Sequence, residues 1–102
     1  MVEAEKIILV VADWEEASRY IKKAAEEVAK EKNIEVEIKK EDYDFLGKYG
    51  VKNEFGGLDI PQAFIKYKNN ETKYVLSRVP LTDKGTPDIK KAKEIINNAL
   101  EG

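Results

Sequence analysis

The pattern of apolar and polar residues along the chain predicts strands that alternate with helices. Residues 6–12 (KIILVVA) form a nearly continuous apolar, β-branched run, which is typical of a strand covered on both faces and central in a sheet. Residues 34–39 (IEVEIK) alternate strictly, which predicts a half-exposed strand at a sheet edge. Two further strands are predicted at residues 62–67 and 73–79, with residues 68–72 joining them as a hairpin.

Three stretches have the spacing and the end signals of helices. The first runs from Trp14 to Lys32, and its apolar face is made mostly of small side chains: Ala17, Ile21, Ala24, Ala25 and Val28. Residues 42–49 suit a short helix that Gly50 ends as the C′ residue. The last helix is expected to open at residues 86–88 (TPD), with an N-cap followed by proline at N1, and to turn five apolar residues inward: Ile89, Ala92, Ile96, Ala99 and Leu100.

The predicted element order is β-α-β-α-β-β-α. The first βαβ unit should give two parallel strands, because such crossovers are right-handed, and the hairpin should then add two antiparallel strands. The predicted fold class is therefore α/β, with a four-stranded mixed sheet and helices on both faces, in a single domain that spans residues 1–102. A ferredoxin-like α+β arrangement is the alternative, and the final helix and the junction at Pro61 count against it.

Length and composition agree with one globular domain and exclude several chemistries. The chain has 102 residues, of which 42% are hydrophobic and 37% charged, so it can bury a core without metals or disulfides. It contains no cysteine and no histidine, which removes thiol–disulfide exchange, thiolate nucleophiles, histidine bases and Cys/His zinc sites. We expect no cofactor, no metal and no enzymatic activity.

The distribution of charge and apolar residues argues against two classes of partner. The 18 basic and 20 acidic residues are interleaved, so no cationic stripe for nucleic acid is formed. The longest apolar run, from Ile7 to Ala12, is far shorter than the ~20 residues of a membrane span. We therefore expect neither nucleic-acid binding nor membrane insertion.

Three short stretches resemble the thioredoxin superfamily in the order that its fold requires. Residues 14–19 (WEEASR) stand where thioredoxins have W-C-x-x-C-K, residues 48–51 (KYGV) resemble their K-Y-G-V, and Ile60-Pro61 matches their I-P, whose peptide bond is cis. This resemblance implies a thioredoxin-like fold for the β-α-β-α-β-β-α order. It also places Glu15 and Ser18 at the two lost redox positions, and neither side chain can exchange disulfides.

The C-terminal half is most similar to the non-catalytic b and b-prime domains of protein disulfide isomerases. The similarity rests on five matches, at residues 49–51 (YGV), 56–61 (GGLDIP), 63–65 (AFI), 73–74 (KY) and 101–102 (EG). In such domains the cysteine pair is lost. The resemblance therefore implies a redox-inactive, chaperone-like domain that binds unfolded protein or peptide segments, or neighbouring domains of a longer chain. We expect a monomer rather than an oligomer.

The cellular compartment depends on the origin of the chain. The resemblance implies the endoplasmic reticulum lumen if the chain is a domain cut from an isomerase, and otherwise we expect a cytoplasmic protein. The sequence does not decide between these locations.

The acidic residues after the first strand have a structural and a chemical interpretation. Asp13 and Glu16 have the spacing of a capping box, and the positive end of the helix dipole favours both, together with Glu15. A pair of carboxylates for acid–base catalysis is the alternative, but no nucleophile or substrate pocket is indicated nearby. We therefore predict that these residues cap the helix.

The candidate peptide-binding residues come from two loops. Trp14 is either a partly buried residue over the sheet or an exposed aromatic anchor for a partner. In the glycine-containing loop, Phe55, Leu58 and Ile60 either pack beneath the loop or form an apolar groove with Trp14 and Tyr49 on its rim. Pro61 must begin its strand, and the resemblance implies that the loop at Pro61 and Gln62 pairs with extended clients.

A second function class is a structural module without client binding. The composition, rich in Lys, Glu and Ile and free of Cys and His, is typical of heat-adapted or idealised proteins. A stable thioredoxin-like scaffold, thermophilic or engineered, is therefore the alternative to a peptide-binding domain.

Overall fold

The computed structural model describes residues 3–101 and shows an α/β fold with a four-stranded mixed sheet and three helices. The strands are β1 (Ala4–Val11), β2 (Glu35–Lys40), β3 (Gln62–Tyr67) and β4 (Thr72–Leu76), and the helices are α1 (Ala17–Lys32), α2 (Tyr43–Tyr49) and α3 (Ile89–Leu100). The predicted element order is confirmed. It differs from the β-α-β-β-α-β order of the ferredoxin-like alternative, which is therefore excluded. Gly102, part of the final matched pair, lies outside the described residues.

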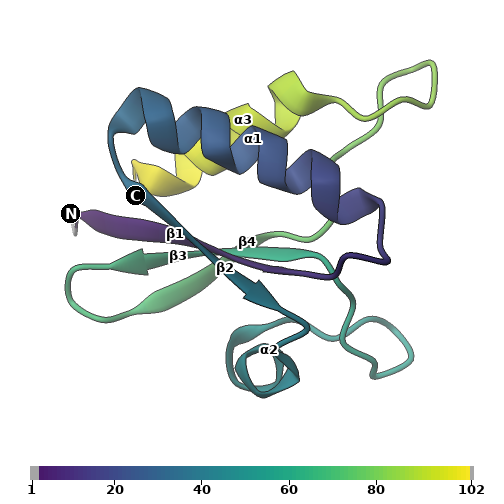
Figure 1. Cartoon of the computed structure of the whole chain (residues 1–102), viewed down its shortest axis with the longest axis horizontal. Helices are drawn as coiled ribbons and strands as arrows, with labels where there is room; N and C mark the ends of the chain where they lie inside the picture. Colours follow the sequence, from purple (N-terminus) through teal and green to yellow (C-terminus); the bar gives the residue numbers. More distant parts are fainter. Residues whose placement is uncertain (1–2, 102) are drawn as a thin grey trace.

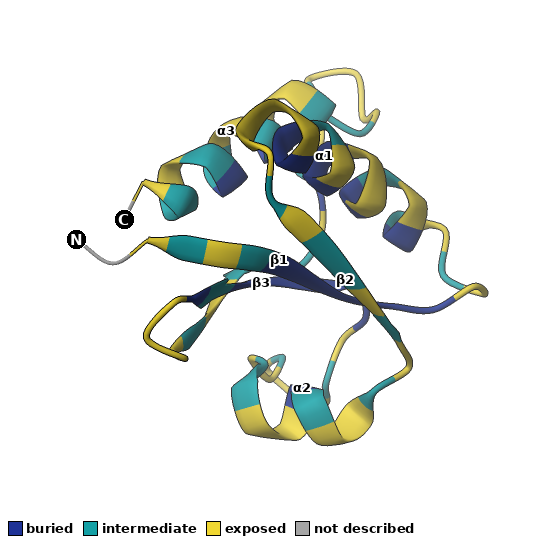
Figure 2. Cartoon of the chain, turned by 60° about the vertical axis from the view of Figure 1, so that its left-hand side comes forward, coloured by how far each residue is buried: buried dark blue, intermediate teal, exposed yellow. Residues whose placement is uncertain are grey.

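The sheet has the strand order β2-β1-β3-β4, which agrees with the predicted central position of the first strand and edge position of the second. β1 is central and its residues Ile7–Val11 are buried, whereas β2 lies at an edge and has only intermediate and exposed residues. β2 runs parallel to β1, and β3 runs antiparallel to both β1 and β4. Figure 2 shows the buried second half of β1 beside the more exposed β2.

The helices cover both faces of the sheet, so the chain has two apolar clusters (Figure 1). The larger cluster packs α1 and α3 against one face and includes Ile7, Ile21 and Ile96. The smaller one packs α2 against the other face through Leu46, with Ile8 and Phe64 of the sheet. The faces of β1 therefore divide between two cores, which explains its nearly continuous apolar sequence.

Two helix ends differ from the sequence-based expectation. The N-cap of α3 is Asp88, whose carboxylate accepts a hydrogen bond from the amide of Lys91, so Thr86 is not the cap and Pro87 is not at N1. A backbone hydrogen bond from Asp88 to Pro80 holds Pro87 in the preceding segment. The helix therefore starts later than the proline signal indicates.

Gly50 ends α2, but for another reason than predicted. Its backbone is extended, with φ −77° and ψ 170°, rather than left-handed. A Cβ atom at this position would lie 2.7 Å from the Leu46 carbonyl oxygen and 2.8 Å from Oε1 of Gln62. Glycine is needed here because the chain passes close to these two groups. The last strand is also shorter than predicted, since β4 ends at Leu76 and not at Val79.

Candidate functional site

The strand register places the candidate residues at one end of the sheet. Val11 at the end of β1 pairs with Lys40 at the end of β2, and Val10 pairs with Gln62 at the start of β3. The loop after β1 and the loop before β3 therefore meet the sheet at the same end, on the right in Figure 1. In α/β sheets the carboxyl ends of parallel strands are the usual place for ligands.

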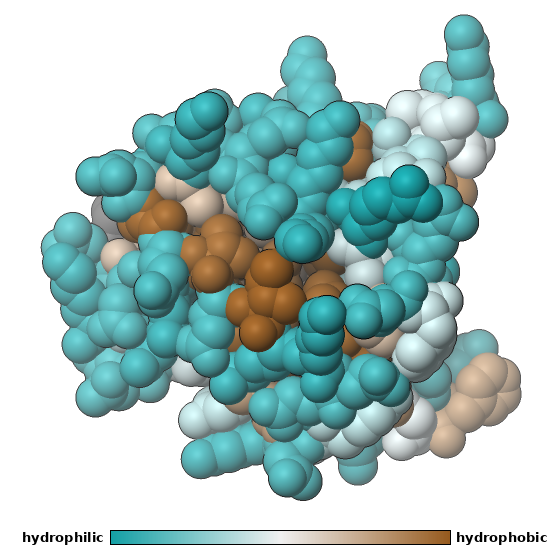
Figure 3. All heavy atoms as spheres, viewed as in Figure 1, coloured by the Kyte–Doolittle hydropathy of each residue, from teal (hydrophilic) through white to brown (hydrophobic). Residues whose placement is uncertain are grey.

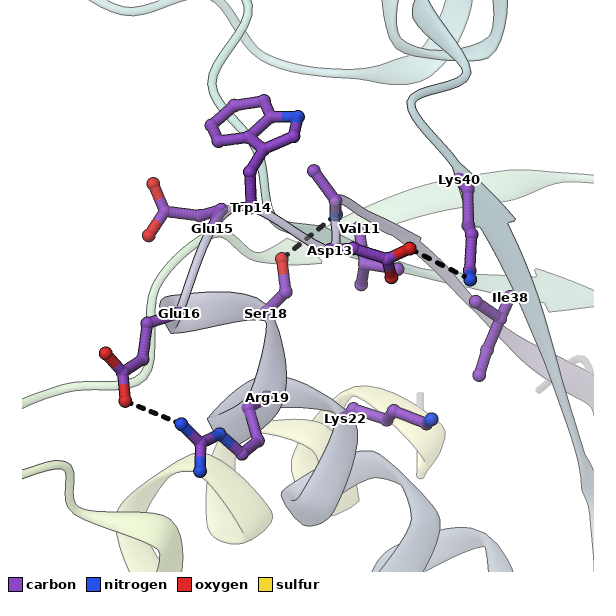
Figure 4. Close-up of a pocket in the computed structure, with 11 residues that line it drawn as sticks. Val11, Asp13, Trp14, Glu15, Glu16, Ser18, Arg19, Lys22, Ile38 and Lys40 are labelled. Atoms are coloured by element: carbon purple, nitrogen blue, oxygen red, sulfur yellow. Dashed lines mark hydrogen bonds and ion pairs between the residues drawn. The ribbon is translucent and has the colours of Figure 1, made fainter.

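A pocket of about 460 Å³ lies between the end of β1, the first turns of α1 and the end of β2 (Figure 4). Its walls combine apolar and charged side chains. They are Val11, Ala12, Asp13, Trp14, Glu15, Glu16, Ser18, Arg19, Lys22, Ile38 and Lys40. We call it the Trp14 pocket. Within the described chain, Trp14 is the one predicted peptide-binding residue that lines it.

Trp14 is an exposed aromatic residue with a fixed polar contact. Its side chain is 64% exposed, and its indole Nε1 donates a hydrogen bond of 3.0 Å to Oε1 of Glu41, which follows β2. Trp14 is therefore an exposed aromatic residue and is not buried over the sheet, and its role as an anchor for a partner stays a prediction. Because the hydrogen bond restrains the ring, little entropy is lost when a partner covers it.

The predicted capping box of Asp13 and Glu16 is wrong. The amide of Glu15 donates to the carbonyl of Ala12, which makes a turn, and α1 starts only at Ala17 with Glu16 as an N-cap that has no side-chain hydrogen bond. The two carboxylates instead form exposed ion pairs, Asp13 with Lys40 at 3.2 Å and Glu16 with Arg19 at 2.7 Å. The carboxylate of Asp13 therefore contacts the end of β2 and accepts no hydrogen bond from a helical amide within the described residues.

Glu15 and Ser18 satisfy backbone groups at the start of α1. The Glu15 carboxylate accepts a hydrogen bond of 3.1 Å from the amide of Ala17, and thus takes over a role that was predicted for Asp13. The buried Ser18 hydroxyl accepts a hydrogen bond of 3.1 Å from the amide of Ala12 (Figure 4). Ser18 therefore fastens the first turn of α1 to the end of β1.

The loop before β3 is a compact turn that presents Phe55 at its tip. Asn53 organises it, because its Oδ1 accepts hydrogen bonds from the amides of Phe55 and Gly57 and its Nδ2 donates to Asp59. Phe55 is 88% exposed, so it neither packs beneath the loop nor joins a groove with Leu58. Leu58 instead packs against the smaller apolar cluster, as the packing interpretation predicts.

The other predicted residues of this segment are largely enclosed. Ile60 and Tyr49 belong to or pack against the smaller apolar cluster. Pro61 is buried, follows a cis peptide bond and directly precedes β3, so the strand itself begins one residue later, at Gln62. Gln62 is fully buried, and its amide group accepts from the Val51 N–H and donates to the carbonyls of Val51 and Asp59. The side chain of Gln62 is therefore occupied within the chain.

A second pocket, which the sequence analysis missed, lies on the other side of the N-terminal end of α1. Its volume is about 600 Å³, and it is lined by Glu15, Glu16, Ala17, Tyr20, Arg78, Val79, Pro80, Leu81, Gly85 and Pro87. We call it the Leu81 pocket, after a residue that is 64% exposed. Residues 79–81 (VPL) are apolar in sequence, but the predicted strand ended at Val79, so the exposed Leu81 beyond it was not considered.

No protein-family model matches the chain, and a search of curated proteins found no match either.

Residues 3–101 contain neither a candidate metal-ion cluster nor a candidate membrane-spanning helix. No group of three or more acidic side chains lies close enough to hold a metal ion in this range. None of the described helices has both the length and the apolar character that crossing a membrane demands. The Trp14 and Leu81 pockets are lined by aromatic, aliphatic and charged side chains.

Proposed function

We propose that the chain is a redox-inactive, thioredoxin-like domain that binds extended segments of other proteins across the N-terminal end of α1. The observation that carries this proposal is that the Trp14 and Leu81 pockets share Glu15 and Glu16, so they adjoin. The Trp14 pocket exposes Trp14 and, to a lesser extent, Ile38, and the Leu81 pocket exposes Leu81. An extended segment could place apolar side chains on both, which is how concave apolar sites recognise their ligands.

The charged residues around Trp14 favour a peptide over a purely apolar ligand. Asp13, Glu16, Arg19 and Lys40 form exposed ion pairs. Such pairs contribute only about 0–1 kcal/mol, so their members can exchange partners with the charged and polar groups of a client. Trp14 supplies the rigid aromatic area that dominates binding free energies at many protein interfaces.

The thioredoxin-like part of the proposal rests on topology and local sequence. The sheet order β2-β1-β3-β4 with helices on both faces supports it, as do the matched stretches at residues 14–19, 48–51 and 60–61. Catalysis by disulfide exchange is absent because the chain has no cysteine. Binding without chemistry is then the activity that these features favour.

The test is a titration of the isotope-labelled chain with an unfolded, cysteine-blocked protein, followed by amide NMR shifts. We expect saturable shifts at residues 12–19 and 78–86. Trp14→Ala should weaken binding about tenfold or more, the effect of losing an aromatic hot spot. Tyr43→Ala is the matched control, since Tyr43 is an exposed aromatic of α2 outside both pockets. Absence of saturable shifts up to millimolar client would contradict the proposal.

A structural module without clients is the second candidate, and ion-pair networks between elements favour it. Lys93 of α3 contacts Glu31 and Glu27 of α1 at 3.0 and 3.3 Å, and their hydrogen bonds raise the pKa of Lys93. Networks of this kind stabilise proteins more at high temperature than at 25 °C.

Thermal unfolding tests this candidate. A Tm above the ~45–65 °C range of ordinary domains, together with no client binding, would favour the structural module. In that case Lys93→Met should lower the Tm, whereas the same change at the exposed Lys90 should not.

A further inference from the structure

The outer edge of β2 has unpaired backbone groups. β2 ends the sheet order, and within the described chain its strand partner is β1 alone. Figures 1 and 2 show β2 at the near side of the sheet, with no other described segment alongside its outer edge. A strand with a free edge is a template for pairing with another strand, and proteins either protect it or use it.

The face of β2 beneath α1 is incompletely covered. Val36 and Ile38 pair with Ile7 and Leu9 of β1 on this face, but Ile38 is 37% exposed whereas Leu9 is fully buried. Figure 3 shows an apolar band across the middle of the molecule on the side where β2 lies. Pairing at the edge of β2 would therefore also cover apolar surface, which favours association.

The charges along β2 are sorted by position. The strand reads EVEIKK, so the acidic residues Glu35 and Glu37 occupy its first half and the basic residues Lys39 and Lys40 its second half. A copy that runs antiparallel brings the acidic half of one strand beside the basic half of the other. Cross-strand pairs of opposite charge stabilise a sheet, and like charges directly opposite destabilise it.

We propose that β2 pairs in antiparallel fashion with β2 of a second copy of this chain, around a twofold axis at Ile38. In this register Ile38 faces Ile38 of the second copy. Glu37 lies opposite Lys39, and Val36 lies opposite Lys40. The result is a closed dimer with a continuous eight-stranded sheet, in which the same surface of each copy forms the interface.

The register follows from the faces of the strand and from its charges. In a continuous sheet, residues directly opposite each other lie on the same face, so one strand can shift against the other only by two residues at a time. Each such shift moves the twofold axis by one residue. One step in either direction places the axis at Glu37 or at Lys39. Glu37 would then face Glu37, or Lys39 would face Lys39, and each arrangement sets like charges against each other. Ile38 is therefore the favoured centre.

The carboxylate of Glu37 can accept further hydrogen bonds from the second copy. Its Oε1 accepts from Lys6 and its Oε2 contacts Lys39 of the same chain at 3.0 Å, and these hydrogen bonds lower the pKa of Glu37. A carboxylate offers about four lone-pair sites, so each oxygen can accept one further donor. Lys39 of the second copy can thus join the existing pairs. The dimer departs from the monomer that the sequence analysis expects.

Cysteine cross-linking tests the position of the axis, because the chain has no cysteine of its own. In Ile38→Cys the two introduced thiols face each other, so under mild oxidation a covalent dimer should form at least about tenfold faster than in Val51→Cys. Val51 is a matched control, since it has a similar exposure (41%) and lies outside β2. Equal rates for the two variants would overturn the proposal.

Sedimentation of the unmodified chain and of charge variants tests the interface in solution. We expect a concentration-dependent dimer, and Lys39→Glu should raise its dissociation constant about tenfold or more because two attractive pairs become repulsive. Lys90→Glu, on the exposed face of α3, makes the same change in net charge and should leave dimerisation unchanged. A chain that stays monomeric to millimolar concentration would overturn the proposal. If Lys39→Glu fails to fold, the cross-linking rates decide.

Discussion

The loop after β1 and the loop before β3 meet the same end of the sheet, yet they are built in opposite ways. The loop at residues 12–16 is open, with its carboxylates in exposed ion pairs and Trp14 largely in solvent. The loop at residues 51–61 is held in place from within, because Gln62 and Asn53 bind its backbone and Ile60 packs in a core, while Phe55 at its tip stays in solvent. Apolar residues in a loop therefore do not by themselves indicate a binding surface. When a buried polar side chain such as Gln62 binds the loop backbone, the apolar residues beside it can pack into the core.

The strongest test of this contrast is Gln62→Leu. The substitution keeps the volume but leaves the N–H and C=O of Val51 and the carbonyl of Asp59 without their partner. We expect a loss of about 3 kcal/mol in the free energy of unfolding, measured by urea denaturation. A loss below about 1 kcal/mol would mean that the loop is not held by Gln62.

Gly50→Ala tests the close contact of the Gly50 backbone with Leu46 and Gln62 at the start of the same loop. The new methyl group would collide with the Leu46 carbonyl and with Gln62, so we expect a destabilisation of about 2 kcal/mol. Gly47→Ala is the matched control, because nothing lies within 4 Å of its Cβ position in α2, and it should stabilise the chain by about 0.5–1 kcal/mol. Equal effects in thermal unfolding would refute the packing argument.

Ser18→Ala tests the one buried connection of the open loop. Without the hydroxyl, the amide of Ala12 loses its acceptor, and we expect a cost of about 1.5 kcal/mol in urea denaturation. Ser77→Ala removes an exposed hydroxyl that contacts Tyr74 and should cost less than about 0.5 kcal/mol. If the two substitutions cost the same, Ser18 does not fasten α1 to β1.

The smallest expected effects on stability are those of Trp14→Ala and Phe55→Ala. Both side chains are mostly exposed, so each substitution should change the free energy of unfolding by less than about 0.5 kcal/mol. The two should differ in client binding, because Trp14 lines a pocket and Phe55 stands at the tip of a turn. Isothermal titration calorimetry should measure the client affinity of both variants. An equal loss of affinity would contradict the claim that only the loop with Trp14 takes part in binding.

The elements of the fold were predictable because their signals are local. The apolar run of β1, the alternation of β2 and the hairpin between β3 and β4 each follow from a few adjacent residues, and the structure confirms them. The start of α1 was not predictable from spacing, since it depends on Ser18 reaching back to Ala12 and on the turn that precedes it. Asp13 and Glu16 match a capping box in sequence but not in geometry.

The site was predictable only in part. Trp14 was identified because it is the one tryptophan of the chain and begins the predicted helix, where part of its side chain should stay exposed. The burial of Gln62 was not predicted, because a polar residue at the start of a strand gives no sign of burial before the loop folds over it. The Leu81 pocket needs Tyr20 of α1 beside residues 79–81, which are far apart in the sequence.

The fluorescence of Trp14 tests the central claim most directly, because it is the one tryptophan of the chain and lies at the proposed site. The chain should be titrated with an extended apolar peptide that contains no tryptophan or tyrosine. If the peptide docks beside Trp14, the emission should shift saturably to shorter wavelength, and Leu81→Ser should weaken the response. Emission that stays unchanged up to millimolar peptide would contradict the account.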